Sequence, residues 1–158
     1  MKKYMLILFS YCGLNKINNH LKGKVKQGDK LYLRAVMLEK VPKLSEHLIS
    51  ETGVLGKKVV HDVEDSVVDI YRDNANKFLE EVKEMAADKK FKLDEKLIEE
   101  HDLKKLKKEI KAAELNRIFI NFSHNKFISN QVREEDIKKW LKKIKLPQDI
   151  FYDGKKEK

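Results

Sequence analysis

The stretch KYMLILFSYCG, residues 3–13, decides the fold. Its centre, residues 5–9, is an unbroken apolar run, whereas a strand with one face in water would alternate apolar and polar side chains. We therefore expect a strand that is buried on both faces, in a parallel sheet covered by helices. The polar loop that follows, Ser10-Tyr11-Cys12-Gly13, lies at the carboxyl end of this strand. Ligands of open α/β sheets bind at that end, where the strand order reverses, so we expect a site between this loop and residues 121–126.

Strand-like and helix-like segments alternate along the rest of the chain. Four further strands are predicted at residues 31–38, 91–98, 116–122 and 149–152, and helices at residues 14–25, 62–88, 101–113 and 137–144. Residues 43–61 show patchy periodicity, which indicates an excursion with one short helix near residues 44–50. Repeated β-α alternation with short connections favours a parallel sheet with right-handed crossovers. The expected fold is a single Rossmann-like α/β domain over residues 1–153, with five parallel strands in the order 3-2-1-4-5, helices on both faces, and a disordered tail at residues 154–158.

Composition narrows the classes of partner. The chain has 158 residues, 41% hydrophobic and 39% charged, with a formal net charge of +9. Its lysines are interleaved with glutamates on the expected helices, which is typical of a solvated basic surface. We therefore expect no nucleic-acid partner. An RNA- or DNA-binding module that uses the positive charge is the alternative function. The single cysteine, Cys12, excludes an internal disulfide, and the scattered histidines lack the spacing of metal ligands, so we expect no metal.

The amino-terminal sequence MKKYMLILFSYCGL has two lysines and a short apolar core, as signal peptides do. The apolar run is only about five to seven residues long and lacks a small-x-small cleavage site. No stretch approaches the ~20 apolar residues of a membrane span. We expect a cytoplasmic protein without a membrane partner.

Four phrases carry a family resemblance: KYMLILFS, KLYLRAVMLEKVP, DSVVDIYRDNANKFLEEVKEMAADK and HDLKKLKKEIKAAELNRIFINFSHNKF. With the order of the elements, they resemble the universal stress protein family over nearly the whole chain. Members that bind ATP carry an Asp-Gly-Ser-like stretch after the first strand and Gly-x2-Gly-x9-Gly-Ser/Thr after the fourth. Here Ser10 stands in place of that aspartate, Asn121 and His124 fall at the first two glycines, and Glu134-Glu135 at the last Gly-Ser.

These departures weaken the implied phosphate cradle. Glycine allows close backbone approach and positive φ, which Asn tolerates partly and His less well. Two carboxylates in place of a Gly-Ser pair repel phosphate by about 1 kcal/mol each near a surface. The resemblance therefore implies a universal stress protein-like regulatory or stress-response domain that has no enzymatic reaction and binds ATP weakly or not at all.

A small polar pocket for ATP, AMP or another monophosphate is the functional interpretation of the two loops. It would use Ser10, Asn121, Ser123, His124 and Lys126, with Lys126 meeting the anion, while the backbone of Val36 would face an adenine, as the resemblance implies. An ordinary polar loop is the simpler interpretation, and we favour it. The alternative function is an ATP- or AMP-binding universal stress protein with a non-glycine phosphate loop. A nucleotide hydrolase is a further alternative, with His124 as the general base.

The resemblance also implies a homodimer through the last strand. That strand contains Asp149, Ile150, Phe151 and Tyr152, is short and apolar, and is expected at a sheet edge that a second copy extends. We expect a charged residue in place of Ile150 to yield a monomer.

Overall fold

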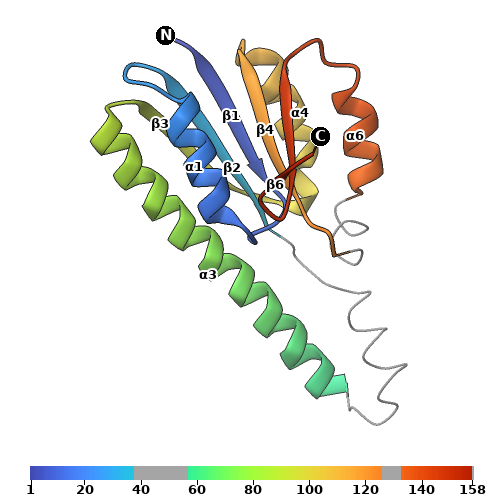
Figure 1. The fold of residues 1–158 in the computed structure, drawn as a ribbon. Coiled ribbons are helices and arrows are strands. Elements are labelled where there is room, and N and C mark those ends of the chain that lie inside the picture. Colours follow the sequence, from blue (N-terminus) through green and yellow to red (C-terminus); the bar gives the residue numbers. More distant parts are fainter. Residues whose placement is uncertain (38–56, 126–132, 158) are drawn as a thin grey trace.

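In the computed structural model, residues 1–37, 57–125 and 133–157 are described, and they form one twisted sheet between two layers of helices (Figure 1). The strand order is β3-β2-β1-β4-β5-β6. The first five strands are parallel in the order predicted from the sequence, and β6 runs antiparallel to β5. The strands are β1 (Lys3–Leu8), β2 (Lys30–Met37), β3 (Lys92–Glu99), β4 (Arg117–Phe122), β5 (Gln148–Tyr152) and β6 (Lys155–Lys156).

The described helices cover both faces of this sheet, as expected (Figure 1). Helices α1 (Leu14–Lys24) and α3 (Lys57–Lys89) lie on one face. On the other face lie α4 (Leu103–Ala112), which follows the short 3-10 helix η1 (Glu100–Asp102), and α6 (Glu134–Leu141). None of the helices in the described residues combines the length and the hydrophobicity of a membrane-spanning segment.

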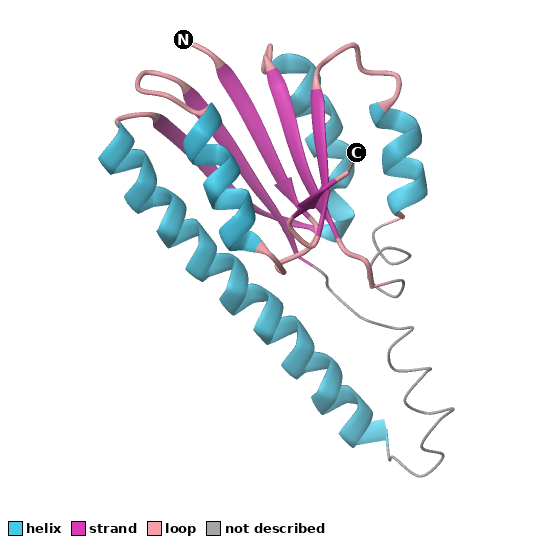
Figure 2. Ribbon diagram, in the orientation of Figure 1, coloured by secondary structure: helices cyan, strands magenta, loops and turns pink. Residues whose placement is uncertain are grey.

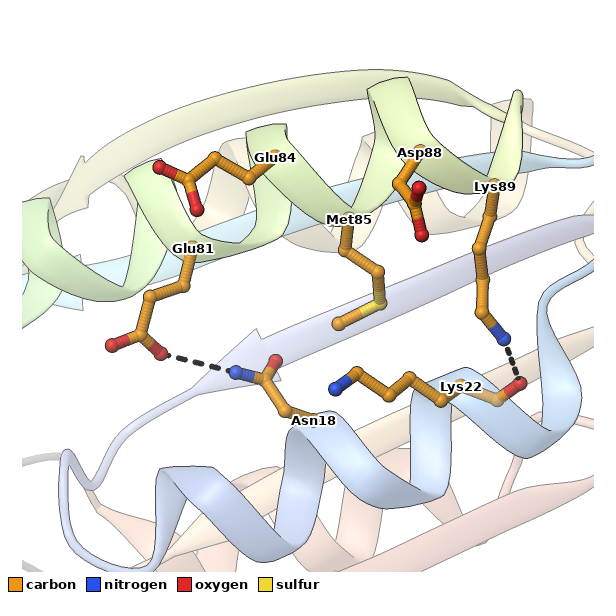
Figure 3. A pocket seen from close by; sticks show the side chains of 7 residues that line it. All are labelled: Asn18, Lys22, Glu81, Glu84, Met85, Asp88 and Lys89. Atoms are coloured by element: carbon orange, nitrogen blue, oxygen red, sulfur yellow. Dashed lines mark hydrogen bonds between the residues drawn. The ribbon is translucent and has the colours of Figure 1, made fainter.

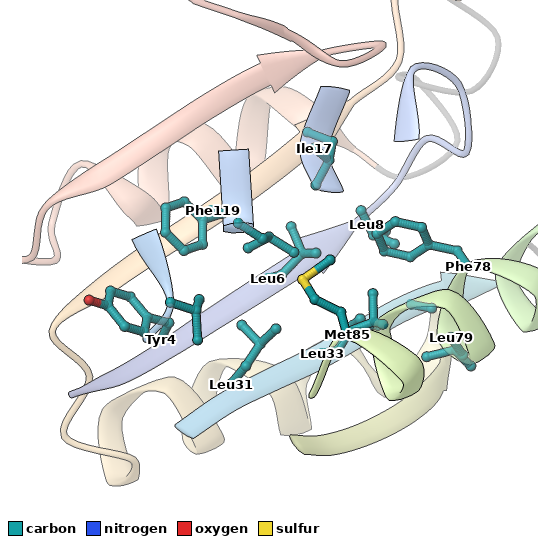
Figure 4. Close-up of a cluster of buried hydrophobic side chains, with 14 of the residues drawn as sticks. Tyr4, Leu6, Leu8, Ile17, Leu31, Leu33, Phe78, Leu79, Met85 and Phe119 are labelled. Atoms are coloured by element: carbon teal, nitrogen blue, oxygen red, sulfur yellow. The ribbon is translucent and has the colours of Figure 1, made fainter. Parts of the chain in front are cut away.

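Strand β1 lies at the centre of both cores, because its side chains alternate between two apolar layers. Tyr4, Leu6 and Leu8 point into the layer under α1 and α3, where they pack with the other apolar side chains of Figure 4, such as Ile17, Leu31, Leu33, Phe78, Met85 and Phe119. Met5, Ile7 and Phe9 point to the layer under α4 and α6, with Leu106, Ile110, Ile137 and Leu141. Fully burying such a side chain contributes roughly 1.5–3 kcal/mol. The apolar run that predicted a doubly covered strand is thus buried on both faces.

Helix α3 is longer than the sequence predicts. It begins at Lys57, inside the segment expected to be an excursion, and not at residue 62. Phe78 and Val82 are buried as expected, but Ile70 on the same helical stripe is 58% exposed. The reason is geometric: the amino-terminal half of α3 extends past the sheet, so Ile70 does not reach the core (Figure 1). The short helix expected near residues 44–50 lies outside the described residues.

The expectation of a disordered tail is wrong for residues 154–157. Lys155 and Lys156 form β6, opposite Tyr152 and Phe151 of β5. Asp153 and Gly154 connect the two strands, and both have positive φ, 47° and 83°. A two-residue Asp-Gly loop with positive φ at both positions is the favoured connection of a tight β-hairpin. The sixth strand of the sheet results from this turn.

Candidate functional site

The carboxyl ends of β1 and β4 lie side by side, as the sequence predicted (Figure 2). Leu8 is paired with Asn121, and the backbone N–H groups of Phe9 and Ser10 both donate to the carbonyl oxygen of Asn121, at 2.9 and 3.1 Å. We call the edge formed by residues 10–13 and 123–125 the mouth. It is the place where a parallel sheet of this order offers its loops to a ligand.

The side chain of Asn121 forms hydrogen bonds to several segments at the mouth. It is fully buried, and its Nδ2 donates to the carbonyl oxygens of Ser10 at 3.1 Å and Cys12 at 3.3 Å. Its Oδ1 accepts the N–H of Gly154 at 3.0 Å. Both ends of the amide are therefore engaged with the chain itself. The residue that falls at the family's first glycine acts here as a clamp between three segments.

A carboxylate from the other end of the chain lies in the mouth. Oδ1 of Asp153 accepts the hydroxyl of Ser10 at 2.5 Å, and Oδ2 accepts the backbone N–H of His124 at 3.1 Å. Hydrogen bonds to an ionised carboxylate are shorter and stronger than neutral ones. An internal anion thus takes the two donors, one from each loop, that a bound phosphate would be expected to use.

The backbones of residues 13 and 153–154 touch. A Cβ built on Gly13 would lie 2.0 Å from the carbonyl oxygen of Asp153, and one built on Gly154 would lie 2.3 Å from the carbonyl oxygen of Gly13. Gly13 has φ 68° and is the N-cap of α1. The β5–β6 hairpin therefore packs against the loop that precedes α1, and glycine is required on both sides of the contact.

Val36, Ser123 and His124, the described members of the predicted site that remain, are also engaged within the chain. The carbonyl oxygen of Val36 accepts the hydroxyl of Tyr11 at 2.8 Å, so the group expected to face an adenine is bonded. Ser123 Oγ accepts the N–H of Asn125 at 3.1 Å. The exposed ring of His124 stacks on Tyr152, with centroids 5.1 Å apart. Lys126 lies outside the described residues.

The structure thus brings Ser10, Asn121, Ser123 and His124 together at the mouth, and places the end of β2 beside them through Tyr11. Sequence reasoning missed Asp153 and Gly154. Their signal was present, because Asp-Gly between a strand and further residues is a hairpin signature. The Glu134 carboxylate, expected near a phosphate, accepts the hydroxyl of Tyr152 at 2.7 Å.

A hollow of about 450 Å³ lies between α1 and α3, away from the mouth (Figure 3). Two hydrogen bonds join residues that line it: Asn18 Nδ2 donates to Glu81 at 3.1 Å, and Lys89 donates to the carbonyl oxygen of Lys22. Met85 lies at its base. Within the described ranges no group of three or more His, Cys, Asp or Glu side chains could hold a metal ion. This groove offers less specific chemistry than the mouth.

The comparisons with known proteins bear on the fold of the chain. No protein-family model matches the chain, and no curated protein matches it. The solved structure of the hypothetical protein MJ0577, described as a structure-based assignment of biochemical function, has a TM-score of 0.52 and 17% sequence identity over 96% of each chain. The likeness shows the fold. The hypothetical protein PH0823 is 15% identical over 96% of each chain, with a TM-score of 0.46.

Proposed function

We propose that this chain is a universal stress protein-like regulatory or stress-response domain whose nucleotide mouth is closed by its own carboxyl-terminal hairpin. The observation that carries the proposal is the carboxylate of Asp153 between the hydroxyl of Ser10 and the N–H of His124. The parallel sheet in the order 3-2-1-4-5 and the family resemblance of the sequence supply the fold-level support.

The closed mouth disfavours a bound triphosphate for two physical reasons. A phosphate charge about 4 Å from the Asp153 carboxylate would be repelled by roughly 1–4 kcal/mol, depending on whether the effective dielectric constant is that of bulk water or of a protein surface. The backbone contact between Gly13 and Gly154 also leaves no room for a ligand at that point. A nucleotide would therefore have to displace the hairpin before it could reach Ser10 and His124.

Thermal unfolding in the presence of ATP or AMP tests this proposal directly. A ligand at a hundred times its Kd stabilises a protein by about 2.7 kcal/mol, which is a shift of several degrees. We expect no shift for the full chain with either nucleotide. A shift of several degrees that disappears in Ser10→Ala would favour the alternative, an ATP- or AMP-binding protein with a non-glycine phosphate loop.

A chain that ends at Tyr152 provides the matched comparison. It lacks Asp153 and the rest of the hairpin, so the donors of Ser10 and His124 become available to an external anion. We expect this truncated chain to respond to AMP more strongly than the full chain does. An equal lack of response in both chains would mean that the hairpin is not what keeps nucleotide out.

The regulatory role is tested in cells. If the chain acts in a stress response, a strain without it should survive starvation or heat less well, and Asp153→Asn should complement it differently from the unchanged chain. The absence of an enzymatic reaction and a cytoplasmic location remain predictions of the sequence. Measurements of nucleotide hydrolysis and cell fractionation test them.

The homodimer expected through Asp149, Ile150, Phe151 and Tyr152 also remains a prediction. β6 pairs with Phe151 and Tyr152, and the N–H of Glu157 donates to the carbonyl oxygen of Ile150 at 2.7 Å. A second copy at this edge would therefore have to join β6 or replace it.

A further inference from the structure

Strand β3 is the outermost strand on the side of the sheet away from the hairpin, and no described strand pairs with its outer edge (Figure 1). The N–H of Lys92 donates to the carbonyl oxygen of Asp29, toward the neighbouring strand, at 2.8 Å. Backbone groups alternate in direction along a strand, so those of Leu93, Glu95 and Leu97 point outward. A row of such outward-facing groups on an edge strand is a template for another strand.

The side chains of β3 also divide between the two helix layers. Glu95 lies 2.9 Å from Lys83 of α3, and Leu93 packs against the core on that face. Asp94 pairs with Arg34 at 3.1 Å, and Ile98 belongs to the core on the α4 face. Odd-numbered side chains therefore share the α3 face and even-numbered ones the α4 face.

One apolar side chain on this edge has no place in the core. Leu97 is 36% exposed, and it is one of three large apolar side chains exposed in the described ranges. It lies on the same face as Leu93 and two residues beyond Glu95. An edge strand that exposes a large aliphatic residue between charged ones is suited to a specific partner strand.

We infer that the outer edge of β3 pairs with β3 of a second copy of this chain, antiparallel and with Glu95 opposite the partner's Glu95. A two-fold axis perpendicular to the sheet keeps like faces together, so residues of the same parity lie opposite each other. In this register Leu93 lies opposite the partner's Leu97, and Asp94 lies opposite the partner's Lys96. The outward N–H and C=O groups of Leu93, Glu95 and Leu97 then bond across the axis.

The neighbouring registers lack this complementarity. Moving the centre to Asp94 places Lys92 opposite the partner's Lys96, and moving it to Lys96 places two ammonium groups directly opposite each other. Like charges directly opposite destabilise a strand pair, whereas opposite charges and aliphatic pairs stabilise it. In the register centred on Glu95 the two central carboxylates each retain the ammonium group of Lys83 from their own chain.

The charges of β3 thus favour the register centred on Glu95 over its two neighbours. Charged residues on edge strands ordinarily prevent indiscriminate sheet extension. Here the sequence Leu-Asp-Glu-Lys-Leu, residues 93–97, places leucine opposite leucine and aspartate opposite lysine when it runs against its own reverse. This self-complementarity, together with the exposed Leu97, is why we assign the edge to a second copy and not to an unrelated strand.

Sedimentation velocity over a range of protein concentrations tests the inference. We expect the unchanged chain to sediment as a dimer, and Lys96→Asp and Leu97→Lys each to sediment as a monomer with unchanged circular dichroism. Both side chains are exposed, so neither change should affect folding. Ile150→Lys at the opposite sheet edge separates this contact from the one expected through residues 149–152. It should leave a dimer paired through β3 intact, whereas a dimer paired through residues 149–152 would be lost.

A cross-link tests the register independently. In a Cys12→Ser background, Glu95→Cys places two thiols across the two-fold axis, with Cα atoms about 5.5 Å apart, within the disulfide range of about 4.4–6.8 Å. Mild oxidation should then yield a covalent dimer. Lys92→Cys, about 20 Å from the partner's equivalent residue along an antiparallel pair, should not cross-link. A monomeric unchanged chain, a dimer lost only in Ile150→Lys, or no cross-link through Glu95→Cys would each overturn the inference.

Discussion

Removing Glu109 should destabilise the fold more than removing the buried arginine that it pairs with. Arg34 of β2 is fully buried, and its Nε lies 3.0 and 3.1 Å from the two carboxylate oxygens of Glu109 on α4. Its Nη2 also contacts Glu109 and lies 3.1 Å from Asp94. Burial lowers the pKa of Arg34, but the hydrogen bonds and charges of Glu109 and Asp94 more than offset this, so the pKa is raised. The guanidinium therefore stays charged, with most of its compensation from Glu109.

The two deletions differ in what they leave behind. Glu109→Ala leaves a buried cation with Asp94 as its remaining ion-pair partner, and breaking a buried pair in this way costs about 3–5 kcal/mol. Arg34→Met removes the desolvated charge and retains most of the volume. The carboxylates left behind are 27% and 35% exposed and can be hydrated. The penalty for breaking a buried pair comes from the charge that is left buried, and these carboxylates are not fully buried, so we expect a cost below about 1.5 kcal/mol.

Urea unfolding followed by circular dichroism measures both free energies. The expected order of stability is unchanged chain, then Arg34→Met, then Glu109→Ala, with about 2 kcal/mol between the variants. Glu114→Ala is the control on the same side of the sheet, because Glu114 is 86% exposed and 4.0 Å from Lys3. It should cost less than about 0.5 kcal/mol. An Arg34→Met variant less stable than Glu109→Ala would refute the reasoning, because leaving the guanidinium buried without Glu109 would then cost less than losing the guanidinium itself.

Three further predictions concern the hairpin and α1. Burial raises the pKa of Asp149, but hydrogen bonds from Lys156 and His20 and the charge of Arg117 lower it more, so the pKa in the folded state is depressed. The ionised Asp149 therefore stabilises the fold at a pH above the ordinary Asp pKa of about 4, and this stabilisation is lost as the pH falls through the lower pKa of the folded state. Between about pH 6 and about pH 3, the free energy of unfolding measured in urea should fall less for Asp149→Asn than for the unchanged chain. Gly154→Ala should cost at least about 2 kcal/mol, because φ is +83° and the new Cβ meets the backbone of Gly13, and thermal melting should show it. Gly23→Ala, with no atom within 4 Å of the new Cβ in helix α1, should stabilise by about 0.5–1 kcal/mol in the same assay.

The strand order was predictable because the strongest signals in the sequence are local. An unbroken apolar run such as residues 5–9 fixes a strand as central, and alternation with amphipathic helices fixes the sheet as parallel. The length of α3 was not predictable in the same way. Its stripe of apolar residues continues through Ile70, but whether a stripe is covered depends on where the sheet ends. The periodicity of apolar residues predicts which face of a helix is buried, but it does not predict how far the sheet beneath that face extends.

The arginine in β2 illustrates a second limit. The sequence LYLRAVM reads as a mostly apolar strand, and Arg34 is buried within it as the pattern implies. Its two carboxylate partners, however, lie 60 and 75 positions further along the chain. From the sequence alone, many of the 26 acidic residues are possible partners of Arg34. A buried charge predicts that a partner exists, but only the packing of α4 and β3 against β2 identifies which one.

The mouth was hard to predict for a related reason. The residues that follow β1 and β4 lack the aspartate and the two glycines of the family that the sequence resembles. An Asp-Gly pair is nevertheless present there, supplied by residues 153–154, and Asp153 bonds to Ser10 across 143 positions. The same pair turns β5 into β6 and requires the close backbone contact at Gly13. Groups that a loop motif does not supply can therefore come from a segment far away in the sequence. The hydrogen bonds to the β5–β6 hairpin explain the polar residues of the mouth as fully as a bound ligand would.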